Sequence, residues 1–448
     1  LGESGDTVTL GSGASQSGFG RTGTVNWQTG SIKTSTFTAV NGEGYFVNTT
    51  GGAVTVNLPA GSAGDIVAFK DYAGTWDTNS VIVTPNGSDK VNGTASNANL
   101  TTEAQSVTLI FVDSTKGWLD IHDSQSNVIG AQYVAATGGN TVITDGNFKT
   151  HVFTGPGTFC VSSAGNPGGS TKVDYVVIAG GGSGGVNCAG GGGGAGGFRL
   201  SNCVGSIPAP TMSPLVKSCG GITVSVTGYP ITVGGGGAGR PNSAGNEGIK
   251  GSDSVFSTIT STGGGKGSGT SSGNGGSGGS GGGGAHSSGC GASGNTPSVS
   301  PPQGNDGGDA TPSSVGGDDC GGGGGGAGAA ADGSSNPQGG IGSFVADSFF
   351  GPTAPSYGEA GPVSNTRYFA GGGGGGARGG PTPAGSTDGG IGGGGNGARG
   401  PSGSGGPESS GTANTGGGGG GAVGPGGGYT PSGGGGSGIV MIRYKFQN

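Results

Sequence analysis

Six glycine runs of four to six residues, each followed by alanine, constrain the fold of this chain more than any other feature of its sequence. The runs start at positions 190, 234, 281, 321, 371 and 416, at intervals of 40 to 50 residues. Glycine and proline supply 123 and 23 of the 448 residues, a share that is typical of low-complexity chains when it has no period. The regular spacing indicates instead an internal quasi-repeat, in which each unit joins a glycine run to a variable segment.

Two interpretations of the runs are open. The first is a flexible linker. The second is a bundle of extended polyproline-II-type helices, which have three residues per turn and no internal hydrogen bonds. Glycine on every face would let such helices approach until their backbones bond to each other, so that buried amides are satisfied without a hydrophobic core. The repeat, and its position between two apolar strand segments, favour the bundle. Collagen is excluded, because no Gly-X-Y period is sustained.

The residues before the glycine runs form an ordinary β-rich sequence. Short segments of β-branched and aromatic residues are separated by Asn, Gly, Pro and Asp, which predicts strands joined by turns. The predicted strands are 36–40, 45–47, 53–58, 66–69, 81–84, 107–112, 117–121, 141–143, 150–154, 159–161, 173–178 and 439–446. Turn signals every ten residues or so predict a small β-sandwich or barrel.

We therefore predict an all-β fold combined with polyglycine-II. The predicted divisions are a shaft or linker segment at 1–30, a β-rich sandwich or barrel domain at 31–130 and a glycine-rich domain at 131–448. Within the last domain, framing strands at 141–178 and 439–446 would bracket a slab of parallel-packed polyglycine helices and loops at 180–438.

The glycine excess also produces patterns that resemble active-site motifs. Gly180, Gly182 and Gly185 follow a predicted strand in a dinucleotide-binding pattern, but that pattern needs a helix next and an acidic residue about 20 positions on, and neither is present. Ser183, Ser277 and Ser280 fit a nucleophile elbow without its helix or its histidine partner. We expect a protein that is not an enzyme and needs no cofactor.

The six cysteines do not form a metal-binding pattern. They form no CxxC pair, and the three histidines are not at ligand spacing, so we expect no metal site. Disulfides and small buried thiols are both compatible with the count. Cys203 and Cys219 flank a proline-rich loop and are the first candidates for a bridged pair.

The charge pattern excludes two further classes of protein. The net charge is −7 and there is no basic cluster, so the electrostatic footprint of a nucleic-acid binder is missing. The longest apolar runs are far too short to cross a bilayer, so we expect no membrane insertion.

Several segments resemble known phage sequences. Residues 24–29 (TVNWQT), 37–46, 54–61 and 112–118 resemble repeats in tail fibres of marine cyanophages and related phages. Residues 173–182 (VDYVVIAGGG), with the closing 438–444, resemble the phage glycine-rich domain. The resemblance implies stacked polyglycine-II helices, a place in the virion tail fibre outside the cell, and other tail or virion proteins as partners.

We therefore expect a structural tail-fibre or adhesin protein, a homo-oligomer (trimer or filament), that binds a host polysaccharide or outer-membrane protein. The alternative is an extracellular filament or sheath subunit without a receptor. Five aromatic residues are concentrated in one segment between glycine runs, and aromatic side chains are enriched at binding hot spots. The candidate receptor contacts are Phe349, Phe350, Tyr357, Tyr368 and Phe369. The alternative role for these five is packing that holds the loops in place.

Overall fold

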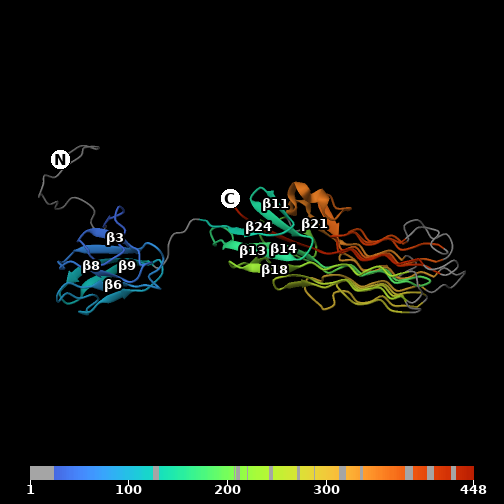
Figure 1. The fold of residues 1–448 in the computed structure, drawn as a ribbon, viewed down its shortest axis with the longest axis horizontal. Coiled ribbons are helices and arrows are strands. Elements are labelled where there is room, and N and C mark those ends of the chain that lie inside the picture. Colours follow the sequence, from blue (N-terminus) through green and yellow to red (C-terminus); the bar gives the residue numbers. More distant parts are fainter. Residues whose placement is uncertain are drawn as a thin grey trace. The chain divides into compact units, whose positions relative to one another are not determined.

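A computed structural model of the chain shows two compact units, residues 1–129 and 130–448, both dominated by β-strands (Figure 1). The structure describes residues 25–124, 131–205, 207, 212–218, 220–241, 246–269, 273–286, 288–311, 319–332, 337–378, 387–400, 408–424 and 430–447. Most of the predicted shaft segment at 1–30 lies outside these residues. The predicted all-β class is confirmed.

The first unit consists of two sheets that pack on one hydrophobic core. Its strands are β1 (Asn26–Trp27), β2 (Phe37–Thr38), β3 (Glu43–Val47), β4 (Val54–Asn57), β5 (Ile66–Asp71), β6 (Val81–Thr84), β7 (Ala98–Leu100), β8 (Ser106–Asp113) and β9 (Gly117–Ser124). The sheet orders are β1-β3-β5-β8-β9 and β2-β4-β6-β7. Alternate residues of β4, β6 and β8 face the core, where Phe69, Trp76 and Trp118 are fully buried.

The winding of this unit differs from a sandwich built of hairpins. The first six strands alternate between the two sheets, and β1-β3-β5 and β2-β4-β6 pair in parallel. Each circuit of the chain therefore adds one strand to each sheet, as in a β-solenoid. Strands β7, β8 and β9 then pair antiparallel. The spacing of turns could not predict this, because parallel circuits and hairpins give the same alternation of strand and turn.

The second unit holds sheets of five, seven and three strands. The first has order β10 (Val134–Thr137), β13 (Gly157–Ala164), β18 (Gly228–Thr232), β19 (Ser254–Phe256) and β20 (Ile259–Ser261). The second has order β11 (Thr141–Asp145), β12 (Phe148–Phe153), β24 (Ile439–Lys445), β14 (Lys172–Ile178), β15 (Phe198–Asn202) and β16 (Lys217–Ser218), and β17 (Ile222–Thr223) also pairs with β14. The third has order β21 (Ser343–Ala346), β23 (Thr366–Phe369) and β22 (Glu359–Ala360), with 3-10 helices η1 (Asp347–Phe349) and η2 (Gly351–Ser356) after β21.

Strand β24 closes the second unit from the far end of the sequence. It lies between β12 and β14 and pairs antiparallel with both, so that Ile439 is opposite Ile178 and Lys445 is opposite Phe148. The predicted strands at 173–178 and 439–446 are therefore neighbours, and everything between them is held at both ends by one sheet.

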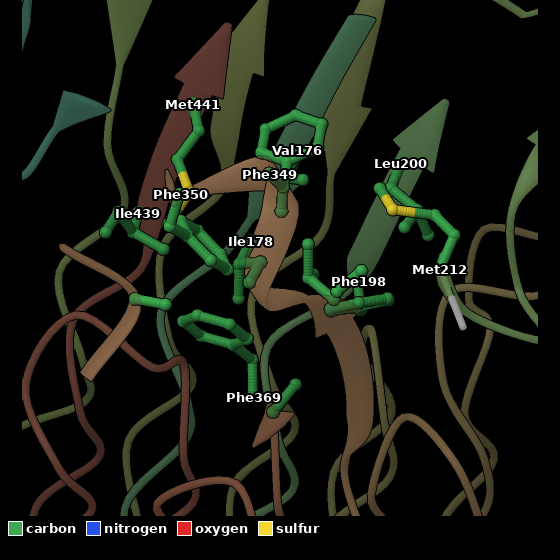
Figure 2. Close-up of a cluster of buried hydrophobic side chains, with 14 of the residues drawn as sticks. Val176, Ile178, Phe198, Leu200, Met212, Phe349, Phe350, Phe369, Ile439 and Met441 are labelled. Atoms are coloured by element: carbon green, nitrogen blue, oxygen red, sulfur yellow. The ribbon is translucent and has the colours of Figure 1, made fainter. Parts of the chain in front are cut away.

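Both faces of the seven-stranded sheet are buried at β14 and β24, which explains why residues 175–178 and 439–442 are apolar on both faces. Tyr175 and Tyr444 belong to a core with residues of the five-stranded sheet, such as Phe256. Ile178 and Met441 point to the opposite face (Figure 2). There they pack with residues of β15, β21, β23 and the 3-10 helices.

Candidate functional site

The glycine runs extend from the sheets of the second unit as long segments that lie side by side (Figure 1). They are not strands, and their amides bond to several neighbours in turn. In the run at 190–195, every third amide donates to the same neighbouring segment. To the segment at 419–422, the amides of Gly190 and Gly193 donate to the carbonyls of Ala422 (2.8 Å) and Gly419 (2.8 Å). To the segment at 265–268, the amides of Gly191 and Gly194 donate to the carbonyls of Ser268 (2.9 Å) and Gly265 (2.8 Å). To the segment at 322–325, the amides of Gly192 and Ala195 donate to the carbonyls of Gly322 (2.9 Å) and Gly325 (3.0 Å). A period of three is the period of an extended polyproline-II-type helix.

The carbonyls of the same run accept from a different set of segments. The amides of three further segments donate to it: Gly182 to Gly194 (2.9 Å), Gly283 to Gly192 (2.9 Å) and Gly373 to Gly193 (2.9 Å). This run is therefore bonded on all sides by backbone alone. We call the bonded runs the glycine lattice.

Neighbouring runs in the lattice do not all point the same way, which corrects the predicted parallel packing. The amides of residues 190 and 193 donate to the carbonyls of residues 422 and 419, so the residue number of the acceptor decreases along the run and these two runs are antiparallel. The amides of residues 192 and 195 donate to the carbonyls of residues 322 and 325, so the number increases and these two runs are parallel. Mixed directions follow from chain connectivity, because successive runs are joined end to end and the chain must return between them.

A side chain cannot be added inside the lattice. A Cβ at Gly373 would overlap the carbonyl oxygen of Gly419, and one at Gly192 would overlap that of Gly373. At Gly235, by contrast, a Cβ would meet nothing within 4 Å. The central glycines are therefore required by close approach of backbones rather than by turns.

Residues of the nucleotide-like and elbow-like patterns belong to this lattice. The amides of Gly180, Gly182 and Gly185 donate to the backbone carbonyls of Ser252, Gly194 and Gly191 at 3.0, 2.9 and 2.9 Å. These amides are therefore already bonded within the protein and are not available to a phosphate. Ser183 is fully buried, and its Oγ accepts from the Ile249 amide at 2.8 Å. No pattern in the sequence predicts this structural role for a serine within a glycine run.

Described residues that flank several variable segments meet at one end of the lattice. The run at 371–376 leaves β23 and ends at Ala377, which forms backbone bridges with Cys320 and Arg399. Cys320 also forms a bridge with Thr311. The segments 312–318, 379–386 and 401–407 lie outside the described residues, but the residues beside them are therefore joined in one place.

Four of the five aromatic candidates, Phe349, Phe350, Tyr357 and Phe369, lie at the other end, in or against the cluster that joins the runs to the sheets, and Figure 2 shows the three phenylalanines. Phe350 and Phe369 are fully buried with ring centroids 6.1 Å apart, and Phe349 is buried beside Phe350. Tyr368 is buried, and Tyr357, half-buried, stacks on Phe350 at 5.5 Å. This placement agrees with the packing alternative, because a buried ring has no surface to offer a receptor while the fold is intact.

A buried carboxylate organises the start of the loop that follows β15. Asp174 is fully buried and accepts from Ser201 Oγ at 2.7 Å and from the amides of Cys203 and Val204 at 2.8 and 2.6 Å. Burial lowers the pKa of Arg443, and the nearby charge of Asp174 opposes that shift. The Arg443 guanidinium lies 3.8 Å from the centre of the Phe148 ring and donates to the Val204 carbonyl at 3.1 Å.

The cysteines and the metal-ligating side chains form no cluster among the described residues. Cys203 forms no disulfide with another described cysteine, and Cys219 lies outside the described residues, so their pairing stays a prediction. No group of three His, Cys, Asp or Glu side chains that could hold a metal ion occurs in the described residues of the chain. In the same residues, no helix is long and apolar enough to span a membrane.

Comparison with protein families assigns both units of the chain. Residues 154–445 match the model of a glycine-rich domain. The chain belongs to this glycine-rich family. Residues 5–122 match the model for the N-terminal region of bacteriophage T4 gp9/10-like proteins. No curated protein matches the chain.

The two matches together confirm the predicted resemblance to a phage tail fibre protein with a C-terminal glycine-rich region. The T4 gp9/10-like match supports a structural role of the virion tail type.

Proposed function

We propose that this phage structural protein is a tail-fibre adhesin that binds a receptor on the host surface through those segments between glycine runs whose flanking residues converge at one end of the lattice. The observation that carries the proposal is the convergence of the residues flanking those segments, with Ala377 bridged to both Cys320 and Arg399. A rigid base that brings variable segments together is how many proteins present binding loops.

The rigidity of the base follows from its hydrogen bonds. Glycine loses more conformational freedom on ordering than any other residue, so an ordered glycine lattice needs extensive bonding to be stable. In the run at 190–195, every amide donates a hydrogen bond, and each of three neighbouring segments accepts two of these bonds from residues three positions apart. We infer that the runs are polyglycine-II helices, since three residues per turn and outward-pointing amides are the defining features of that arrangement.

The proposed action is binding without catalysis or cofactor. Ser183, within one elbow-like pattern, is buried and bonded inside the lattice. The receptor classes that we propose for these segments are a surface polysaccharide and an outer-membrane protein, and repeated copies in a homo-oligomer would strengthen weak single contacts through avidity.

Competition for phage adsorption tests the proposal. The purified chain should inhibit adsorption of the phage that encodes it to susceptible cells. Replacing residues 379–386 and 401–407 by glycine-serine segments of equal length should weaken inhibition at least about tenfold, which corresponds to about 1.4 kcal/mol, and leave the Tm unchanged. The matched control replaces 362–364, in the turn between β22 and β23, and should compete like the parent chain.

Two outcomes would contradict the proposal. Equal competition by the parent and the 379–386/401–407 variant would place the contacts elsewhere. A chain that never competes and assembles into a helical polymer of one subunit type would favour the filament or sheath alternative.

A further inference from the structure

The chain contains five Asn-Gly pairs, and one of them differs from the others in the structure. Asparagine deamidates most readily before glycine, because glycine has no side chain to hinder the approach of its amide to the preceding side chain. The structure describes all five pairs, which begin at Asn41, Asn86, Asn92, Asn274 and Asn396. All five asparagines are exposed, so access to water does not distinguish them. Of the five glycines that follow, Gly87 is the exposed one.

The pair at Asn41 is restrained by hydrogen bonds on both of its reacting groups. Asn41 Nδ2 donates to Asp65 Oδ1 at 2.5 Å, and Asn41 Oδ1 accepts from the Ile66 amide at 2.9 Å. The Gly42 amide donates to the Ile66 carbonyl at 2.7 Å. The side-chain carbon and the backbone nitrogen that must meet for deamidation are therefore both held in other directions.

The two pairs of the glycine-rich unit are restrained in the same way. In each, the side-chain oxygen of the asparagine accepts from a backbone amide, and the amide of the following glycine donates to a backbone carbonyl. At 274–275 both bonds join Cys290, at 2.9 and 3.0 Å. At 396–397 they join Gly389 at 2.9 Å and Thr387 at 2.8 Å.

The remaining two pairs lie in the first unit and differ from each other. At 92–93 the glycine amide is held, since it donates to the Lys116 carbonyl at 2.7 Å. At 86–87, by contrast, no described residue bonds to the side chain of Asn86 or to the amide of Gly87. The φ of Gly87 is +52°, a conformation that glycine adopts without strain. Both reacting groups of this pair are therefore exposed and unrestrained.

We propose that Asn86 is a site of spontaneous deamidation. The backbone nitrogen of Gly87 bonds to Cγ of Asn86, the bond between Cγ and Nδ2 breaks, and ammonia leaves with the former amide proton of Gly87. Water then opens the resulting five-membered imide at either carbonyl, which leaves aspartate or isoaspartate at position 86. The net reaction consumes one water and releases one ammonia, and it needs no enzyme, oxidant or reductant.

The product would alter the turn between β6 and β7. The amide of Asp89 donates to the Asn86 carbonyl at 2.8 Å, and Asp89 Oδ2 accepts from the Gly61 amide at 2.9 Å. Either product adds a negative charge to a turn that already carries the Asp89 carboxylate. In isoaspartate, the carbonyl that accepts from Asp89 becomes part of a side-chain carboxylate, and the main chain is one carbon longer. This bond of the turn would therefore be lost.

Peptide mapping of the full chain by mass spectrometry tests the site. The folded protein is kept in mildly alkaline buffer, which favours loss of the glycine amide proton, and is digested at intervals. Asn86 should deamidate at least about tenfold faster than each of the other four asparagines, which corresponds to about 1.4 kcal/mol in activation free energy. A parallel sample unfolded in urea should lose this selectivity, because all five asparagines precede glycine and none is then restrained.

The variant Asn86→Gln is the control, since glutamine would have to form a larger ring. Most of the early release of ammonia from the folded parent should be absent from this variant, and its Tm should match that of the parent. The proposal is overturned if Asn86 in the folded chain reacts no faster than the other four asparagines. It is equally overturned if the unfolded chain shows the same preference for Asn86, because local sequence rather than the fold would then select the site. Phage adsorption does not enter this readout, so its failure is distinct from failure of the adhesin proposal.

Discussion

Nε2 of His151 lies 3.1 Å from the hydroxyl oxygen of Tyr444, a residue 293 positions further along the chain. Nδ1 of the same ring lies 2.7 Å from the Gly138 carbonyl, which can only accept, so Nδ1 of the neutral ring carries the proton. The Tyr444 hydroxyl has two acceptors for its one proton, Nε2 and the Ala136 carbonyl at 3.4 Å. The contact connects β12 to the closing strand β24 within a fully packed core. A single neutral imidazole therefore helps to hold together the two ends of the glycine-rich unit.

This contact predicts that the second unit loses stability in acid. Burial lowers the pKa of His151 below its ordinary value of 6.5, so the unfolded chain takes up a proton more readily than the folded one. The contribution is fully present above pH 6.5 and decreases as the pH falls through the lowered pKa of the folded state. Melting curves between pH 7.5 and pH 4.5 should therefore show a falling Tm.

The variant His151→Gln isolates this contribution from that of the carboxylates. Its Tm should be lower than that of the parent at neutral pH, because glutamine cannot reproduce both ring contacts. The difference between the two proteins should shrink as the pH falls below 6.5. A difference that stays constant over the whole range would show that His151 does not titrate as argued.

A single methyl group should distinguish a lattice glycine from a solvated one. Gly373→Ala would drive a Cβ into the Gly419 carbonyl and push the two runs apart, so that their amides would lose partners, at about 1–3 kcal/mol for each buried group. Gly235→Ala is the matched control, because its Cβ meets nothing. Reduced chain entropy should leave that variant unchanged or more stable by up to about 1 kcal/mol.

Thermal melting and soluble yield measure this contrast. We expect Gly373→Ala to melt well below the parent or to be insoluble, and Gly235→Ala to match the parent. Equal melting temperatures for all three proteins would mean that the run at 371–376 is a linker.

The sequence was sufficient to locate the strands that frame the lattice. The strands at 173–178 and 439–446 contain the uninterrupted apolar runs 175–178 and 439–442 because both faces of their sheet are buried there, and this pattern is visible without a structure. Every predicted strand has a counterpart in the structure, since alternation of apolar residues depends only on near neighbours.

Which glycine run lies beside which could not be predicted. The runs have nearly the same sequence, so their side chains contain no information on partner or register. That information lies in isolated non-glycine residues, such as Gln303, whose Oε1 accepts from the Thr262 amide at 2.9 Å and whose Nε2 donates to the Pro297 carbonyl at 3.0 Å. Contacts of this kind join segments far apart in sequence and carry no local signal.

The candidate site was predictable in kind but not in its residues. Composition identified the aromatic concentration around Phe350, yet the same composition serves a core or a contact surface, and only burial distinguishes them.

Removal of the charge at Asp174 should destabilise the glycine-rich unit. Asp174→Asn keeps the size of the side chain, but one oxygen becomes an NH₂ group that cannot accept from the Val204 or Cys203 amide. Hydrogen bonds to a charged group contribute about 1.5–3 kcal/mol, so we expect a loss of at least that size in urea unfolding. Asp309→Asn is the control, since Asp309 is exposed and accepts from the Gly291 amide at 2.8 Å. A loss no larger than that of the control would mean that the buried carboxylate is not needed.

Phe350 should prove to be an anchor of the fold. Its ring is fully buried among Phe349, Tyr357 and Phe369, and truncation of such a residue costs about 3–5 kcal/mol. Phe350→Ala should therefore lower the Tm, while Val363→Ala, at a position that is 37% exposed, should leave it unchanged. Inhibition of phage adsorption per folded molecule should be the same for both variants and the parent. If Phe350→Ala kept its melting temperature and lost inhibition, the ring would be a receptor contact, and the packing around it would have to open when the receptor binds.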